Sequence, residues 1–548
     1  MSRNDLPNID GLEISPEERT PLVRGLLEII AKLQETNRRL ERTVDELKEE
    51  IRRLKGIPER PQRKPSSLEQ PAPPGAKKRR RGKRPGSAKR MKTRELVVDE
   101  TVPLEPEHVP AGSELHDYRM FTVQDLKVHK WVVRYRRARY RNPETGKMIS
   151  APLSDEVRRY GHFGPGLRAY VLCQYYQNHV TEPLIVEDLR DRGLDISTGE
   201  VHAMLTEGHD VFHAEKDELL PAAREVSNIF HTDDTPARHQ GQNAHTHQIG
   251  NKLFTSFTTT QTKSRLNFLT ILRAPFTDYV LREESLWCLE HQGASQRVMD
   301  RLRAALGNEE ALIFLDDAAW TAQLAAWRVP ESAVKAVTEA ALIGCLIHRD
   351  LYPDVTLMSD DAGQFQVLGF MNGLCWIHGV RHIDELVPET TSQRRSQERV
   401  LTKIWKYYRR LKAYRESPSP QAKARLGRDF DAIFGSKTGW PELNTVMERL
   451  HQKRESLLLV LDHPETPLNN NLSEHDIREY AKKRKISAGT RNEIGRRCRD
   501  TFLSLKKTCR KLAVSFSQFI QDRINGLCKI PPLAEIIRQK AQLANSPS

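Results

Sequence analysis

Cysteines are few in this sequence and follow no pattern. There are seven, an odd number; none belongs to a Cys-x-x-Cys pair, and the first is Cys173. A secreted disulfide framework would need an even number of cysteines at regular spacings. We therefore expect buried free thiols in a reducing compartment.

Long apolar runs are missing as well. No stretch approaches the roughly 18 apolar residues of a membrane-spanning helix. The N-terminus shows no charged segment followed by an apolar one, as a secretion signal would. These absences favour a cytoplasmic protein without a membrane partner.

Acidic residues are outnumbered, and the positive excess lies mostly in one segment. Lys and Arg total 87 against 73 Asp and Glu, which gives a net charge of +14. Residues 57–94 are rich in Pro, Ser, Gly, Lys and Arg, and such a composition predicts a disordered linker. We expect this linker to bind DNA phosphates without regard to sequence, with a merely solvated tether as the alternative. The expected DNA-binding residues are Lys77, Lys78, Arg79, Arg80, Arg81, Lys83 and Arg84.

Residues 21–56 carry an uninterrupted heptad repeat. Its two seam positions alternate at spacings of three and four residues, and the second position is always Leu. β-Branched residues at the first position favour a parallel two-stranded coiled coil, and one buried Asn fixes its register. The repeat predicts a homodimer, and a helix packed on its own domain is the alternative. The seam residues are Val23, Leu26, Ile30, Leu33, Asn37, Leu40, Val44, Leu47, Ile51 and Leu54.

Two regions follow the linker. Residues 95–158 predict a small β-rich module with a turn at Asn142–Pro143. Arg134 and Arg136 stand at alternate positions before that turn, which predicts a basic strand face, with a plain exposed hairpin as the alternative. Residues 160–222 predict a helical region that contains a helix-turn-helix. Gly193 ends the first helix of that pair, and Ser197 with Glu200 forms a capping box at the start of the second. Whether the second helix contacts DNA stays open, because many helical hairpins share this pattern.

Acidic residues stand beside apolar, strand-like runs. Residues 226–230 are expected to form a buried strand that leads into His231–Pro236 (HTDDTP). Residues 252–260 and 266–272 are rich in β-branched or apolar side chains and predict two more strands of a meander. A further strand at 355–358 is followed by acids, and residues 373–379 predict the strand after it.

Three carboxylates from separate segments have plausible places around one sheet: Asp233, Asp360 and Glu474. Carboxylate oxygens suit divalent ions such as Mg²⁺, and two such ions suit phosphoryl transfer. Asp316 competes as a ligand, although it is more simply the cap of the helix that follows it. Glu474 also has two interpretations, since it lies three residues after Asn471 and can complete a capping-box-like turn.

Two helical stretches complete the pattern. Residues 392–465 predict a helical insertion rich in Arg, Lys and aromatic residues. The last predicted helix carries a basic stripe after Glu474, formed by Arg478, Lys482 and Lys485, as a DNA track beside a metal ligand would need.

Together these motifs resemble those of a DDE transposase of the insertion-sequence 66 family. The resemblance rests on His231–Pro236, on Ser359–Phe365, on Cys375–His378 with Arg381, and on Asn469–Glu474 with the basic residues after it. It covers roughly residues 160 to 525, and the coiled coil with its basic linker matches the usual front end of the family. The sequence departs from the family in having no cysteine zinc module before the helix-turn-helix, where the 95–158 module would be a metal-free counterpart.

The resemblance implies an α/β fold with an RNase H-like catalytic core. The first part of that core would span 223–391, the helical insertion 392–465, and the catalytic Glu helix with the C-terminal helices 466–530. Asp233, Asp360 and Glu474 would be the catalytic residues and the ligands of two Mg²⁺ ions, with Mn²⁺ as a substitute. Secondary candidates are Asp234, His378 and Arg381.

The implied activity is cleavage and strand transfer of DNA at the ends of an insertion sequence. The partners would be element ends, target DNA, a second copy of the chain and accessory proteins of the element, in a bacterial, nucleoid-associated setting. Two alternatives differ in class: a dimeric DNA-binding regulator whose acids only cap helices, and a catalytically silent relative that still binds DNA.

Overall fold

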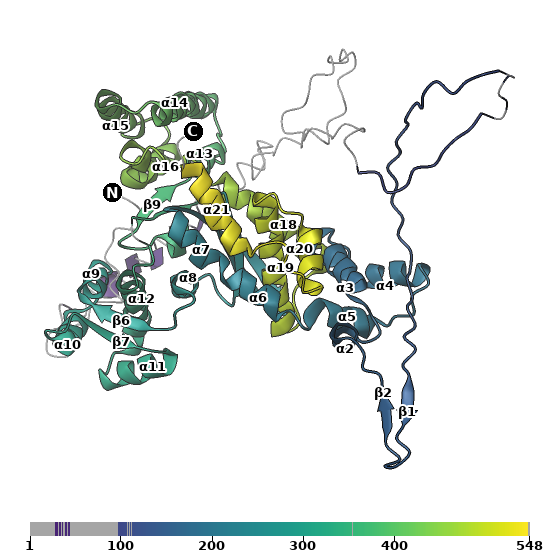
Figure 1. The fold of residues 1–548 in the computed structure, drawn as a ribbon. Coiled ribbons are helices and arrows are strands. Elements are labelled where there is room, and N and C mark those ends of the chain that lie inside the picture. Colours follow the sequence, from purple (N-terminus) through teal and green to yellow (C-terminus); the bar gives the residue numbers. More distant parts are fainter. Residues whose placement is uncertain are drawn as a thin grey trace.

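The computed structural model describes residues 97–545, except 107, 109, 111 and 353, together with scattered helical residues between Val23 and Glu46. Most of the heptad segment and the whole basic linker lie outside the described residues. No helix in the described part of the chain is long and apolar enough to cross a membrane. Figure 1 shows the arrangement of the helices and strands.

The stretch before the helical region contains little regular β-structure. In the described residues of 97–158 it is limited to one hairpin, in which β1 (Arg139–Arg141) pairs antiparallel with β2 (Met148–Ser150). Asn142 closes the turn, because its side chain accepts a hydrogen bond from the backbone of Glu144 at 2.8 Å. The hairpin is almost wholly exposed, including Tyr140 and Ile149, which pair with each other across it. Arg134 and Arg136 lie before β1, so the plain exposed hairpin describes this part of the chain.

The predicted helix pair is present. The first helix, α4 (Glu182–Asp191), is followed by Gly193 with a φ of 77°, a backbone conformation that favours glycine. The second, α5 (Thr198–Thr206), begins with the predicted capping box, in which Ser197 and Glu200 each bond to the other's backbone N–H. The neighbouring helices are α2 (Asp155–Tyr160), α3 (Pro165–Leu172), η3 (Cys173–Gln177), α6 (Asp210–Asp217) and α7 (Leu219–Val226).

A five-stranded mixed sheet lies at the centre of the molecule. Its order is β5-β4-β3-β8-β9; the first three strands pair antiparallel, whereas β8 is parallel to both β3 and β9. The α/β class is therefore confirmed. The strands are β3 (Ile229–His239), β4 (Gln242–Gly250), β5 (Thr255–Thr260), β8 (Thr356–Ser359) and β9 (Met371–Leu374).

Three expected strand boundaries are wrong. The expected strand at 266–272 is helix α8 (Arg265–Arg273), capped by Ser264, which accepts from the backbone of Asn267. The expected strand at 373–379 ends at Leu374, and α13 (Trp376–Asp384) begins directly after it. The strand expected at 226–230 begins only at Ile229, because α7 extends to Val226. The HTDDTP motif therefore lies inside β3 rather than beyond a strand. Short apolar runs fit a helix as well as a strand, and here packing decided between them.

The free edge of the sheet is covered by a helix. Helix α19 (Glu493–Lys511) runs along β5, and its side chains accept the backbone N–H groups that an edge strand leaves unpaired. Asp500, Ser504 and Thr508 recur every four residues and accept from alternate residues of β5, at 2.8 to 3.1 Å. This edge therefore offers no template for pairing with another strand.

Two insertions interrupt the sheet. The first lies between β5 and β8 and contains helix α12 (Glu331–His348), which is buried from Val337 to Leu346. Helix α12 packs against β6 (Tyr279–Arg282), which pairs antiparallel with β7 (Ala311–Phe314). Its other helices are α8, α9 (Glu283–His291), α10 (Gln296–Leu306) and α11 (Asp317–Ala326).

The second insertion follows β9 and is helical, as predicted for 392–465. It has its own apolar core, in which Trp376 lies against Tyr407, Phe430 and Phe434. Figure 1 shows α13 to α16 gathered at one end of the molecule, next to β9. After α13 it comprises α14 (Thr391–Glu416), α15 (Pro420–Phe434), α16 (Pro441–Gln452), α17 (Arg454–Leu457) and η5 (Leu459–Leu461). The chain then continues through α18 (Asn471–Ser487), α19, α20 (Phe516–Ile524) and α21 (Leu533–Asn545).

Candidate active site

Asp233 lies on β3, and Asp360 directly follows the neighbouring strand β8, where the parallel ladder between the two strands ends. The last pair of that ladder is His231 with Met358, and each aspartate follows two residues later. The pKa of Asp233 is raised to about 7, first because burial withdraws the carboxyl group from water and next because Asp360 carries a like charge. Glu474 adds to the same rise, so the three carboxylates share one electrostatic environment.

Asn470 joins the third acid to the strand that carries the first. Its fully buried side chain bonds to His231 Nδ1 at 2.9 Å and donates to the carbonyl oxygen of Thr232 at 2.8 Å. Side chains two residues apart on a strand point to the same face, so Asp233 shares the face of His231, against which Asn470 lies. Glu474 follows Asn470 by one helical turn, so α18 begins beside the face of β3 that carries Asp233.

The capping interpretation of Glu474 does not describe the structure. Asn470, not Asn471, is the residue before α18, and its side chain makes no capping hydrogen bond because it is engaged with β3. The carboxylate of Glu474 accepts instead from Arg478 at 3.1 Å. Its Oε1 atom is buried without a hydrogen-bond partner in the described part of the chain. An acid in this position is available to a ligand.

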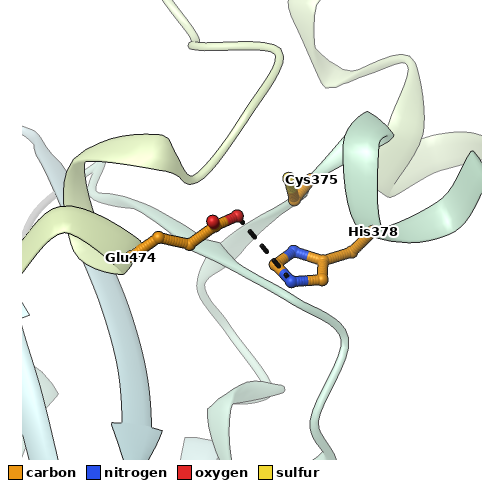
Figure 2. A group of neighbouring side chains, drawn as sticks. All are labelled: Cys375, His378 and Glu474. Atoms are coloured by element: carbon orange, nitrogen blue, oxygen red, sulfur yellow. Dashed lines mark ion pairs between the residues drawn. The ribbon is translucent and has the colours of Figure 1, made fainter. Parts of the chain in front are cut away.

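Cys375 and His378 lie beside Glu474 at the start of α13 (Figure 2). One potential ligand atom from each of the three residues falls within 4.8 Å of the others, and His378 Nε2 is 3.8 Å from Glu474 Oε1. The sulfur of Cys375 accepts the backbone N–H of Asn470 at 3.2 Å, and burial raises the pKa of this thiol. Cys375 thus ties β9 to the start of α18, in keeping with the packing role predicted for it. Burial and the neighbouring Arg381 lower the pKa of His378, which favours a neutral imidazole at the edge of the site.

The second aspartate of each Asp-Asp pair has another partner. Asp234 accepts a hydrogen bond from Gln364, and burial raises its pKa. Asp361 has a φ of 84° and forms an ion pair with Lys453. Adjacent residues of a strand point to opposite faces, so this geometry favours Asp233 over Asp234 as the acid of the site.

Asp316 lies in a different part of the structure. It caps α11 by accepting from the backbone of Ala319 at 2.8 Å, beside the two-stranded sheet of the first insertion. The capping interpretation preferred for this residue is confirmed.

The predicted basic stripe lies on the exposed side of the same helix as Glu474. Arg478, Lys482 and Lys485 are exposed, whereas Lys483 is fully buried and donates to the carbonyl oxygen of Tyr175 at 2.7 Å. Lys77 to Arg84 lie outside the described residues.

A buried polar network that we had not predicted holds α18 in place. Ser473 bonds to Gln248 of β4, and Asp476 accepts from Thr255 Oγ1 at 2.6 Å and from Lys511 Nζ at 2.6 Å. Ser473, Asp476, Tyr480 and Lys483 recur at three- and four-residue spacings, so they share the buried face of α18. That spacing was the signal in the sequence, hidden because the residues are polar.

Comparison with known proteins indicates the family of the chain. The family model described as "Transposase IS66 family" matches residues 313–497, a span that includes Asp360, Cys375, His378 and Glu474. The chain belongs to the IS66 family of transposases. It is also similar to an uncharacterized protein, y4jO, of Sinorhizobium fredii (strain NBRC 101917 / NGR234), with 39% identity over 328 residues. That match covers 59% of this IS66-family chain and 100% of the relative.

Proposed function

We propose that this IS66-family protein cuts and joins DNA through Asp233, Asp360 and Glu474, held on an RNase H-like core. The observation that carries the proposal is the electrostatic coupling of these carboxylates, which come from segments far apart in the chain: both other acids raise the pKa of Asp233. The strand order and the mixed pairing of the central sheet support the assignment of the core.

The acids of this site fit divalent cations. Asp360 and Glu474 both raise the pKa of Asp233, and Glu474 has a buried oxygen that accepts no hydrogen bond in the described part of the chain. A bound cation would relieve this crowding of negative charge. Asp233, Asp360 and Glu474 would hold two Mg²⁺ ions, or Mn²⁺ in their place. When bound, such ions activate water or a 3′-hydroxyl and stabilise the oxygens of an in-line displacement.

In this proposal the residues of the chain hold the reacting groups in position, and none of them acts as a covalent nucleophile. Asn470 fixes the start of α18 against β3, and the network around Asp476 fixes the rest of that helix against β4 and α19. Such rigid placement keeps the reacting groups aligned, which is how positioning lowers a barrier. His378, beside Glu474, is placed to orient that carboxylate.

DNA would reach the site along exposed basic residues. Arg478, Lys482 and Lys485 lie on the same helix as Glu474, and we propose that they contact the DNA backbone. The basic linker would add affinity that does not depend on sequence, and α4 with α5 would act as a helix-turn-helix. We also propose a dimer, because Leu33 and Leu40 of the heptad seam are 62% and 58% exposed in the single chain and need a partner to cover them.

The test is incubation of the protein with labelled duplex DNA that carries an element end, in Mg²⁺ and in chelator. We expect strand cleavage in Mg²⁺ and binding without cleavage in chelator. Binding without cleavage in both conditions would favour the alternative of a silent relative or a regulator.

A further inference from the structure

The second insertion exposes a basic helix face that the proposed activity does not use. Helix α14 contains nine Arg and Lys residues but only two acids, Glu398 and Glu416. Its apolar side, which includes Ile404, Tyr407 and Leu411, is buried in the core of the insertion. The charged side is therefore the one that faces solvent.

Four basic residues line the middle of that solvent face. Arg395, Arg399, Lys406 and Arg409 follow one another at spacings of four, seven and three residues, which keeps them on one side of a helix. All four are exposed, and no ion pair or hydrogen bond joins their side chains to other described residues. At a rise of about 1.5 Å per residue, the row is roughly 21 Å long.

The helix is anchored to the proposed active site at two points. Trp376, two residues before His378, lies against Tyr407 and Tyr408 of α14. The hydroxyl of Tyr408 accepts from Asn469, which directly precedes the buried Asn470, at 3.3 Å. Through these contacts α14 has a fixed relation both to α13 and to the start of α18.

We infer that this face of α14 binds the phosphate backbone of duplex DNA. An unpaired row of positive charge complements a polyanion, and a duplex carries about one phosphate per 3.4 Å of each strand, so the row can meet several phosphates. A membrane surface does not fit, since an interfacial helix needs a free apolar face and that of α14 is buried. The inference rests on the proposed function only for the choice of DNA as the polyanion.

The binding test is made in chelator, so that it does not depend on cleavage. We would compare the wild-type chain with a variant that combines Arg395→Gln, Arg399→Gln, Lys406→Gln and Arg409→Gln. The matched control combines Arg297→Gln, Lys335→Gln, Arg510→Gln and Lys529→Gln, which removes the same charge from four scattered exposed positions. Fluorescence anisotropy with a labelled duplex of unrelated sequence, over a series of salt concentrations, measures affinity and its salt dependence.

The face variant should bind about tenfold or more weakly than the control. The slope of log affinity against log salt should become shallower by about 3.6, because each of the four lost phosphate contacts removes about 0.9. Equal slopes and affinities for the two variants would overturn the inference. If the face variant melts below the control, the pairs Arg395→Gln with Arg399→Gln and Lys406→Gln with Arg409→Gln are tested separately, each with half the expected change in slope.

Cleavage by the wild-type protein in Mg²⁺ is measured separately. Weaker binding by the face variant together with an inactive wild type would leave this inference standing and contradict the proposed function. If the wild type cleaves DNA and the face variant binds DNA as tightly as the control, the proposed function stands and this inference is contradicted.

Discussion

The side chain of Asn470 bonds to His231 on one side and to the carbonyl oxygen of Thr232 on the other, and it is fully buried. One amide therefore joins the start of the helix that carries Glu474 to the strand that carries Asp233. Asn470→Ala would leave a buried imidazole and a buried carbonyl without partners, at a cost of about 1–3 kcal/mol.

We expect Asn470→Ala to lower both the thermal stability and the rate of strand cleavage. Asn469→Ala is the matched control, since Asn469 is less buried and its two hydrogen bonds, to Tyr408 and from the backbone of Asn471, are longer at 3.3 Å each. Melting curves and single-turnover cleavage of both variants give the comparison. Equal behaviour of the two would mean that Asn470 does not position the site.

The raised pKa of Asp233 makes the stability of the metal-free protein depend on pH. Between the ordinary Asp value of about 3.9 and the folded value of about 7, the folded protein holds a proton that the unfolded chain has lost. The free energy of unfolding should therefore fall as pH rises from about 4 to about 7. We expect a fall on the order of 2 kcal/mol, after allowance for the water that reaches this partly buried group.

Asp233→Asn should flatten that fall, and Asp316→Asn should leave it unchanged. Above pH 7, Mg²⁺ should raise the melting temperature of the wild type more than that of Asp233→Asn, because a bound ion stabilises only the folded state. The measurement is chemical or thermal unfolding in chelator and in Mg²⁺. A wild type and an Asp233→Asn variant with the same pH profile would refute this account of the carboxylate cluster.

Lys483 should make the free energy of unfolding change with pH in the opposite direction. Burial lowers the pKa of this amine to about 6, although it donates to Tyr175 and lies over the Tyr175 ring. The unfolded chain then binds more protons than the folded one between about pH 6 and pH 10, so the free energy of unfolding should rise with pH in that range.

Lys483→Met removes the buried amine while keeping its length. We expect it to stabilise the protein at pH 7 by about 1–3 kcal/mol and to abolish the rise with pH. Lys482→Met, at the exposed neighbouring position, should do neither. A destabilised Lys483→Met variant would show that the bond to Tyr175 outweighs the cost of burying the amine.

Local patterns predicted local structure well. The capping box of Ser197 and Glu200, the cap made by Asp316 and the helical insertion at 392–465 are all present. These features depend on residues within a few positions of one another, so their signal survives in the sequence. The apolar residues of the run at 266–272 fit either a strand or a helix, and only packing against the rest of the first insertion decides for a helix.

The contacts of the site could not be predicted in this way. The nearness of Asp233 and Asp360 depends on the parallel register of β3 with β8, across an insertion of more than 90 residues. The bond between Asn470 and His231 depends on how α18 docks on the sheet. For the three acids, therefore, the sequence offered candidates through their places beside strand-like runs and through a family resemblance, and their shared environment became visible only in the fold.

The heptad seam yields a prediction about assembly. Leu33→Pro combined with Leu40→Pro should abolish dimerisation, because each proline costs about 3 kcal/mol in a helix interior. Sedimentation at several protein concentrations measures the change, and Glu35→Ala, off the seam, is the control. A dimer that survives the prolines would place the interface elsewhere.

The most direct test of the central claim is the rate of metal-dependent strand cleavage by single amide variants of the three acids. Asp233→Asn, Asp360→Asn and Glu474→Gln keep size and most hydrogen bonding but each remove one charge that the metal ions need. We expect each to bind DNA normally and to cleave it slower by orders of magnitude, without additive losses when combined, because residues that act as one unit fail together. Asp316→Asn should cleave at the normal rate and lose only about 1 kcal/mol of stability. Normal cleavage by Glu474→Gln, or by either aspartate variant, would contradict the proposed site.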